Sequence, residues 1–175
     1  ALAAWPAAVT VTPDRVTLTL PREGRDAALA AMHRALHADG RIRAWRDEPF
    51  PLMTRDGREV LAVVERASAR FWGSLTLGAH CNGWVAGPDG RPASLWIARR
   101  SADKATDPGK LDNLVGGGVA FGQTPHAALV REGWEEAGLS PAQMQPAHEF
   151  ARLLIERDVE EGRQVERLHA FDLEL

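Results

Sequence analysis

Apolar and polar residues alternate near the start of the chain and then take up a helical period. Between Val9 and Leu20 the alternation is interrupted by Pro13-Asp14, which predicts two short strands joined by a turn. Residues 26–38 are rich in alanine and carry larger apolar residues at helical spacing, and Gly40 is a suitable stop. This part of the chain therefore predicts a small unit of strands and one helix.

A second change of pattern comes before residue 73. Pro49-Phe50-Pro51 predicts a break in regular structure, and residues 60–69 predict a second helix. We place a domain boundary near Gly73, where this helical pattern ends. The prediction is a small α+β domain over residues 1–73 and a second domain over residues 74–175.

The second part of the chain reads mainly as strands. Residues 75–85 and 94–99 predict a hairpin around the turn at residues 87–90, and a long polar loop follows. Near the end, residues 150–157 and 164–175 predict two further strands. This part of the chain therefore predicts a hairpin followed, after the loop and a helix, by two further strands.

One helix is predicted by three independent signals. Thr124 is a suitable N-cap, Pro125 suits the first helical position, and Gly138 fits the position just past the C-terminus. The signals agree on a helix over residues 125–137.

One face of this predicted helix is acidic. At about 100° per residue, Glu132, Glu135 and Glu136 fall in one sector, and apolar residues lie opposite. Arg131 can pair with Glu135 but cannot neutralise three acids. Oxygen ligands suit Mg²⁺ or Mn²⁺, and the run Gly116–Gly118 lets the backbone approach a ligand closely. A solvated acidic face is the common alternative, so the metal site depends on this context.

Composition narrows the class of protein. The chain has 175 residues, of which 45% are hydrophobic and 26% charged, with a formal net charge of −3. No apolar run approaches the roughly 20 residues that span a bilayer, and the acidic balance argues against a broad nucleic-acid-binding surface. The single cysteine, Cys81, cannot form an internal disulfide, so we expect a cytoplasmic protein. The chain starts without methionine and stops within a predicted strand, and we expect a piece of a longer protein that lacks part of its site.

The stretch 117–139 resembles the Nudix box, whose pattern is Gly, five residues, Glu, seven residues, Arg-Glu, an aliphatic residue, any residue, Glu-Glu, any residue, Gly and an aliphatic residue. The glycines, the arginine and three of four glutamates are in register, while Gln123 replaces a glutamate and Gly133 an aliphatic residue. The resemblance implies an α/β fold, an α/β/α sandwich around a mixed sheet. It also implies Mg²⁺-dependent hydrolysis of a small diphosphate.

The resemblance also assigns roles. It makes Glu132 a base or metal ligand, Glu135 and Glu136 the main metal ligands, Arg131 an orienting partner, and Gly117 a carbonyl donor to the metal. Because Gln123 brings no charge, a lower metal affinity or fewer bound ions are expected. Metal ions would neutralise the diphosphate oxygens and lower the pKa of a bound water.

A wider resemblance covers most of the chain. The run from Leu95 to Ser101, the loop to Asn113 and the preceding small domain are similar to thiamin-pyrophosphokinase-related Nudix hydrolases. That group implies thiamin diphosphate or an oxidised analogue as substrate, and many relatives form homodimers. The residues that would bind the diphosphate or lie in the matching run are Arg99, Arg100, Lys104, Lys110 and Asn113.

Two alternatives remain. Isopentenyl-diphosphate isomerases share the arginine–serine–lysine–proline–glycine pattern, but they use a cysteine near the glycine-rich turn, where this chain has Asn113-Leu114-Val115. A non-catalytic diphosphate-binding module on the same scaffold is favoured by Gln123 and opposed by the three intact glutamates. Loss of all metal dependence would favour the binding module.

Overall fold

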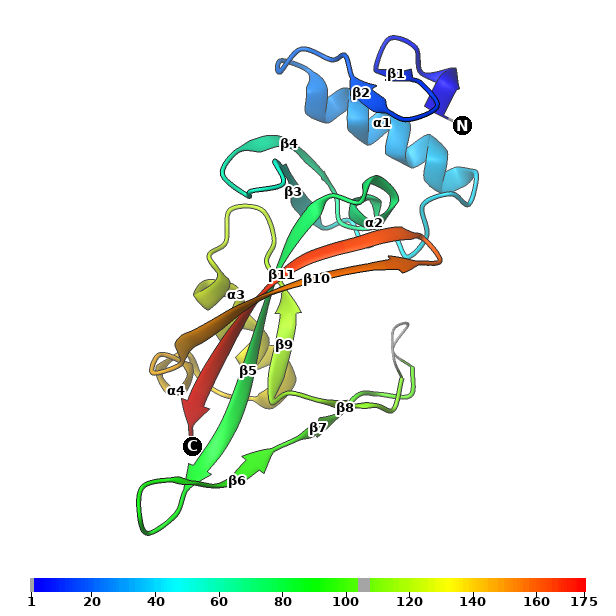
Figure 1. The fold of residues 1–175 in the computed structure, drawn as a ribbon. Helices are drawn as coiled ribbons and strands as arrows, with labels where there is room; N and C mark the ends of the chain where they lie inside the picture. The colour runs from blue at the N-terminus through cyan, green and yellow to red at the C-terminus, as the bar shows by residue number, and fades with distance from the viewer. Residues whose placement is uncertain (1, 104–107) are drawn as a thin grey trace. The chain divides into compact units, whose positions relative to one another are not determined.

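The computed structural model describes residues 2–103 and 108–175, in two compact units (Figure 1). One unit comprises Ala1–Thr76 with Glu156–Val165, and the other comprises Leu77–Ile155 with Glu166–Leu175. The predicted domain boundary near Gly73 stays a prediction, because a division by contacts does not show which segments fold independently.

The N-terminal unit contains two antiparallel strand pairs and two helices. The elements are η1 (Leu2–Ala4), β1 (Val9–Val11), β2 (Val16–Leu18), α1 (Arg25–Ala38), β3 (Pro49–Met53), β4 (Val60–Glu65) and α2 (Ser68–Trp72). Strand β1 pairs with β2 and β3 pairs with β4. Leu29, Met32 and Leu36 of α1 pack in one core with Ala62 and Val64 of β4. The predicted first hairpin and first helix are confirmed.

The predicted helix over residues 60–69 is wrong. Residues 60–65 form strand β4, and only Ser68–Trp72 is helical. The valines of β4 favour an extended chain, and pairing with β3 satisfies its backbone. Strand β3 itself runs through Pro49-Phe50-Pro51, where a break was predicted; a two-stranded sheet has only edge strands, which tolerate proline.

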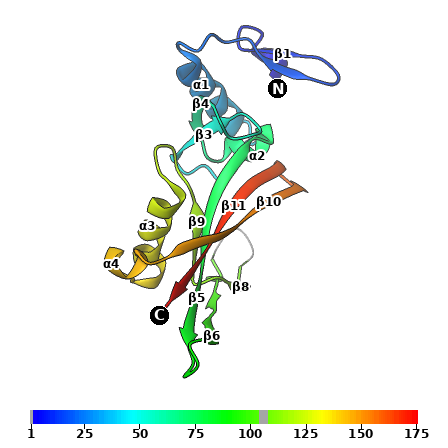
Figure 2. The same ribbon diagram turned by 60° about the vertical axis from the view of Figure 1, so that its left-hand side comes forward.

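The C-terminal unit is built on a mixed sheet. Its elements are β5 (Leu75–Ala86), β6 (Pro92–Trp96), β7 (Ala98–Arg99), β8 (Leu111–Asp112), β9 (Val115–Gly118), α3 (Pro125–Ala137), α4 (Pro141–Met144), β10 (His148–Val159) and β11 (Gly162–Glu174). The strand order is β10-β11-β5-β6, with β9 also paired to β5. Strands β6 and β9 are antiparallel to β5. Asn82 contacts Asp172 and Trp84 contacts Leu175, so β11 advances in the same direction as β5 (Figures 1 and 2).

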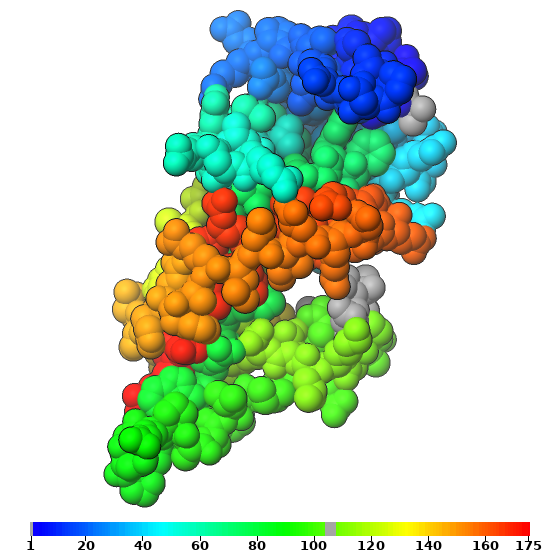
Figure 3. Space-filling view, viewed as in Figure 1, coloured from blue at the N-terminus to red at the C-terminus, as the bar shows by residue number. Residues whose placement is uncertain are grey.

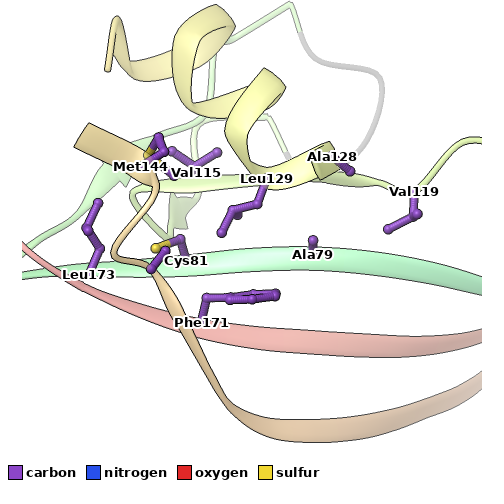
Figure 4. Packing of buried hydrophobic residues seen from close by; sticks show 10 residues of the cluster. Ala79, Cys81, Val115, Val119, Ala128, Leu129, Met144, Phe171 and Leu173 are labelled. Carbon is purple, nitrogen blue, oxygen red and sulfur yellow. The ribbon is translucent and has the colours of Figure 1, made fainter. Parts of the chain in front are cut away.

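Helix α3 covers one face of this sheet. Ala128 and Leu129 of α3 pack against Ala79 and Cys81 of β5 and Phe171 of β11, as Figure 4 shows. Because side chains alternate along a strand, His80, Asn82 and Trp84 of β5 project from the opposite face of the sheet. The predicted α/β class with a mixed sheet and a small N-terminal unit is confirmed.

Two further observations complete the fold. Strand β10 is exposed along most of its length, and its surface is drawn in orange in Figure 3. Among the residues that the structure describes, no helix is both long enough and apolar enough to span a membrane.

Candidate active site

The ends of α3 are fixed as the sequence predicts. The Thr124 hydroxyl accepts a hydrogen bond from the Ala127 N–H (3.1 Å), and Pro125 occupies the first turn. Gly138 ends the helix in the left-handed region at a φ of 67°. Since Ala128 and Leu129 are buried in the core, the rotation of α3 is also fixed, with Glu135 and Glu136 exposed and Glu132 half-buried at the edge of the packed face.

The backbone of β9 lies directly against the first glutamate of α3. A Cβ added at Gly117 would overlap the side chain of Glu132, so only glycine permits this approach. The Glu132 side chain is 14% exposed. Burial raises the pKa of its carboxyl; Arg131 opposes this rise, and Glu136 and Glu135 add to it. The structure therefore brings together Gly117 and Glu132, which the Nudix box places far apart in sequence.

Arg131 joins two of the three glutamates. Its Nη2 lies 2.7 Å from Glu132 Oε1 and its Nη1 lies 2.8 Å from Glu135 Oε2. Glu136 Oε2 accepts a hydrogen bond from the Gly116 N–H (3.3 Å). Glu132 and Glu136 thus lie against β9, Arg131 links Glu135 to Glu132, and each of the three carboxylates has a partner.

The oxygen atoms around Gly117 and Glu132 are of the kind that a hard divalent cation binds, although the carboxylates do not point at one common position. Among the described residues, no three His, Cys, Asp or Glu side chains are grouped as metal ligands. Gln123 Oε1 is buried and has no hydrogen-bond partner among them, so an oxygen is left unsatisfied where the box has a glutamate. Carboxylate, amide and backbone oxygens are what Mg²⁺ and Mn²⁺ prefer. Arg131 engages one oxygen of Glu132 and one of Glu135, so a cation would bind through the other oxygen of each carboxylate.

The predicted substrate-binding cations have different environments. Arg99 Nη1 donates to the Gly109 carbonyl (3.0 Å), and Arg100 Nη1 pairs with Asp112 Oδ2 (2.5 Å). Lys110 is exposed, and Lys104 lies outside the described residues. Their binding roles stay predictions.

Asn113 lies in a polar network on the face of the sheet opposite α3. Its Oδ1 is 3.0 Å from His80 Nδ1, and its Nδ2 donates to Asn82 Oδ1 (2.6 Å). Asn82 Nδ2 in turn donates to Asp172 Oδ1 (2.9 Å). The sequence analysis did not single out His80, Asn82 or Asp172. The alternation of polar and apolar residues along β5 is the signal that could have found the first two.

This network borders a pocket of about 450 Å³ on the same face. The pocket is lined by Asn82, Trp84, Pro92, Leu95, His148, Phe150 and Asp172. These residues come from β5, β6, β10 and β11, which are distant in sequence but adjacent in the sheet.

Cys81 is not placed for chemistry. Its side chain is fully buried in the core beneath α3, and burial, reinforced by Asp172, raises the pKa of its thiol to about 12. An isomerase that needs a reactive thiol at the site is therefore disfavoured.

Comparison with known proteins identifies a family domain in the half of the chain that contains the candidate site. Residues 76–175 match the NUDIX domain, and residues 1–75 match a domain of unknown function, DUF4743. The chain is 40% identical over 137 residues to Nudix hydrolase 20, chloroplastic, of Arabidopsis thaliana, covering 74% of this chain and 36% of that protein. It is 39% identical over 118 residues to Nudix hydrolase 24, chloroplastic, of the same plant, covering 67% and 32%. The chain thus spans about a third of the length of these curated relatives.

A solved structure shares the fold. The crystal structure of DR0079 from Deinococcus radiodurans aligns with a TM-score of 0.55 at 24% identity, covering 73% of this chain and 72% of that one. At this identity the likeness concerns the fold alone.

Proposed function

Because the chain belongs to the Nudix family through residues 76–175, we propose that it hydrolyses a diphosphate linkage in a small organic diphosphate with the help of Mg²⁺ or Mn²⁺. The observation that carries this proposal is the contact between Gly117 and Glu132, which brings the first glycine of the Nudix box against the glutamate of its Arg-Glu pair. Arg131, Glu135 and Glu136 lie in the same turn and a half of helix.

The proposed ligands for the metal ion are Glu132, Glu135, Glu136 and the carbonyl of Gly117. When bound, the ion would neutralise the diphosphate oxygens and lower the pKa of a coordinated water. Hydrolysis would join a water oxygen to one phosphorus and break the bridging P–O bond, with a proton of the water passing to Glu132 and the bridging oxygen leaving on the second product.

The chain's own residues hold the acids in position for this reaction. Arg131 restrains Glu132 and Glu135 through its two ion pairs, and the Gly116 N–H restrains Glu136. Glu132 is the candidate proton acceptor, because burial raises the pKa of its carboxyl and so makes its carboxylate a stronger base.

As substrate we propose thiamin diphosphate or an oxidised analogue, which would yield the monophosphate and phosphate. The support is the similarity of the loop and the preceding domain to the thiamin-pyrophosphokinase-related group, together with the match of residues 1–75 to DUF4743. Arg99, Arg100, Lys104, Lys110 and Asn113 are the proposed contacts to the substrate.

A non-catalytic binding module is the second candidate. The observation in its favour is Gln123, whose neutral amide replaces a charged ligand and whose oxygen is unpartnered among the described residues. Such a module would bind a diphosphate but release no phosphate.

The test is a measurement of phosphate release from thiamin diphosphate, oxothiamin diphosphate, ADP-ribose and nucleoside triphosphates, with and without Mg²⁺. Glu136→Gln removes a proposed ligand while keeping the shape of the side chain. The matched control is Glu160→Gln, which changes an exposed glutamate that pairs with Arg43 inside the N-terminal unit. We expect metal-dependent turnover of one compound that Glu136→Gln abolishes and the control retains. Tight binding without turnover would select the binding module.

A further inference from the structure

The pocket on the sheet face opposite α3 combines aromatic walls with one carboxylate. Trp84 of β5 and Phe150 of β10 supply flat apolar surfaces, and Phe150 is 53% exposed. Asp172 of β11 lies among the same lining residues. A flat ring can stack on such surfaces while its edge reaches a hydrogen-bond acceptor.

The carboxylate is held in one orientation by its neighbours. Asn82 donates from Nδ2 to Asp172 Oδ1 and accepts at Oδ1 from Asn113 Nδ2, so both ends of its amide are engaged. An amide engaged at both ends cannot turn over without losing both bonds. Asp172 accepts one hydrogen bond from Asn82, and a carboxylate has capacity for several more. Asn82 therefore positions one carboxylate oxygen of Asp172 before any ligand binds.

The charge of the pocket selects against phosphate. Its lining residues include one carboxylate and no lysine or arginine. A phosphate group would be repelled by Asp172, whereas a cation or an N–H donor would be attracted. A different part of the substrate from the diphosphate must therefore occupy it.

The pocket is also tied to the proposed active site. Asn113 reaches from the pocket's network to His80, and a Cβ added at Gly116 would approach His80 Cε1 to 2.9 Å. The N–H of the same Gly116 donates to Glu136. One continuous set of contacts thus runs from the pocket to a proposed metal ligand.

We propose that this pocket binds the organic end of the diphosphate substrate, as a flat heteroaromatic ring that carries an amino group or a positive charge, with the ring stacked on Trp84 and the amino group donating to Asp172. This inference rests on the proposed function for the identity of the other end of the molecule. It adds Asp172, Asn82 and Trp84 as residues that determine specificity.

The test is calorimetric binding of three probes without any diphosphate, in EDTA. Adenosine and thiamin carry an exocyclic amino group, and thiamin also carries a positive charge. Inosine has the size of adenosine but an oxygen in place of the amino group. We expect inosine to bind about tenfold more weakly than adenosine, because the half-buried carboxylate of Asp172 then faces an acceptor. Equal affinity for the two nucleosides, or no binding of any probe, would overturn the proposal.

Three variants locate the binding. Asp172→Asn should reduce the preference for adenosine over inosine about tenfold, because its amide oxygen can still accept from Asn82 while the charge is lost. Trp84→Leu should weaken all three probes. Asp158→Asn, an exposed aspartate paired with Arg163, should change nothing. Thermal unfolding of each variant shows that it is folded, and unchanged probe affinities in folded Asp172→Asn would contradict the assignment.

The test of the pocket can succeed or fail independently of the test of the proposed hydrolysis. Probe binding in EDTA needs neither metal nor hydrolysis, and Glu136→Gln should bind the probes as the unchanged chain does. Probe binding without turnover of any diphosphate would leave the pocket assignment intact and reject the hydrolase. Turnover that is indifferent to Asp172→Asn and Trp84→Leu would do the reverse.

Discussion

At the scale of single residues, the space beside Gly117 is as important as the glutamates. The Glu132 side chain fills the volume in which a Cβ would lie, so the acid and the backbone of Gly117 are in direct contact. A substitution here changes no charge and removes no proposed ligand atom, and it therefore tests position alone.

Gly117→Ala should displace Glu132 and lower both Mg²⁺ affinity and phosphate release by about tenfold or more, because ligand geometry must be held closely for metal catalysis. Calorimetric titration with Mg²⁺ measures the affinity, and phosphate release at increasing Mg²⁺ concentration measures the activity. The control is Gly90→Ala, at a turn glycine with a φ of 73° and open space around it. It should cost some stability through backbone strain and leave Mg²⁺ affinity unchanged. Equal effects of both substitutions would refute a specific role for Gly117.

Gly133 gives a second prediction at this scale. By helix propensity alone, Gly133→Ala should stabilise α3 by up to about 1 kcal/mol. A Cβ at this position would come within 2.7 Å of Met144 Cγ and Sδ, in the fully buried contact between α3 and α4. We therefore expect a net loss of about 1–2 kcal/mol in the free energy of unfolding, because overpacking outweighs propensity.

Urea denaturation of Gly133→Ala, Met144→Ala and the double variant measures this coupling. In the double variant, the alanine at position 133 should no longer be destabilising, because the shortened side chain at position 144 leaves room for it. Stabilisation in the single Gly133→Ala variant would show that Met144 adapts without cost.

Residues whose role depends on their near neighbours in sequence could be predicted from the sequence. The caps of α3 and the acidic face follow from neighbours within one helix, and the structure has both. The roles of Gly133 and Asp172 could not be predicted from the sequence. Gly133 is explained by its contact with Met144 on another helix, and Asp172 by its hydrogen bond with Asn82, which is distant in sequence. Gln123 was identified as a departure from the box, but its burial was not predictable.

At the scale of elements, the same distinction separates β4 from α3. Residues 60–65 contain apolar residues that satisfy a helical or an extended pattern, and only pairing with β3 decides between them. Helix α3 carries capping signals at both ends, so its prediction depended less on tertiary contacts.

A prediction for helix α1 concerns how its stability depends on pH. His33 is fully buried, its Nε2 accepts from Trp72 Nε1–H (2.8 Å), and its Nδ1 has no partner among the described residues. Burial lowers the pKa of His33 to about 4, from an ordinary value of 6.5. The unfolded chain therefore binds a proton at a higher pH than the folded chain does, and stability that is complete above about pH 6.5 is lost as pH falls toward 4.

The expected loss is about 3 kcal/mol across that window, at roughly 1.4 kcal/mol per pH unit. Hydrogen exchange of α1 amides between pH 7 and 4, corrected for the intrinsic rate, reports it locally. His33→Gln keeps an acceptor for Trp72 without a titrating group, and should flatten the dependence. An equally steep dependence in His33→Gln would assign the effect to other groups.

At the scale of the whole molecule, metal binding should be visible as stability. An ion that binds the folded chain at ten times its dissociation constant stabilises it by about 1.4 kcal/mol. We expect Mg²⁺ to raise the unfolding temperature measured by calorimetry, and Glu136→Gln to lose most of that rise. Ca²⁺ serves as the comparison, because its larger radius suits a different ligand number. The same rise in Glu136→Gln would place the bound ion elsewhere.

Other predictions at this scale stay open. A cytoplasmic location and a homodimer were expected from the single cysteine and from the resemblance. Sedimentation of the chain tests the dimer, and localisation of a tagged chain tests the compartment.

The tip of the β10–β11 hairpin groups with the N-terminal unit, and this has a consequence for synthesis on the ribosome. Glu160 and Glu161 pair with Arg43 and Arg70, and a Cβ at Gly162 would collide with the carbonyl of Arg70. Residues 1–76 therefore complete their contacts only after residues 156–165 have left the ribosome. A nascent chain released between these two segments would carry an N-terminal unit with one side unpacked.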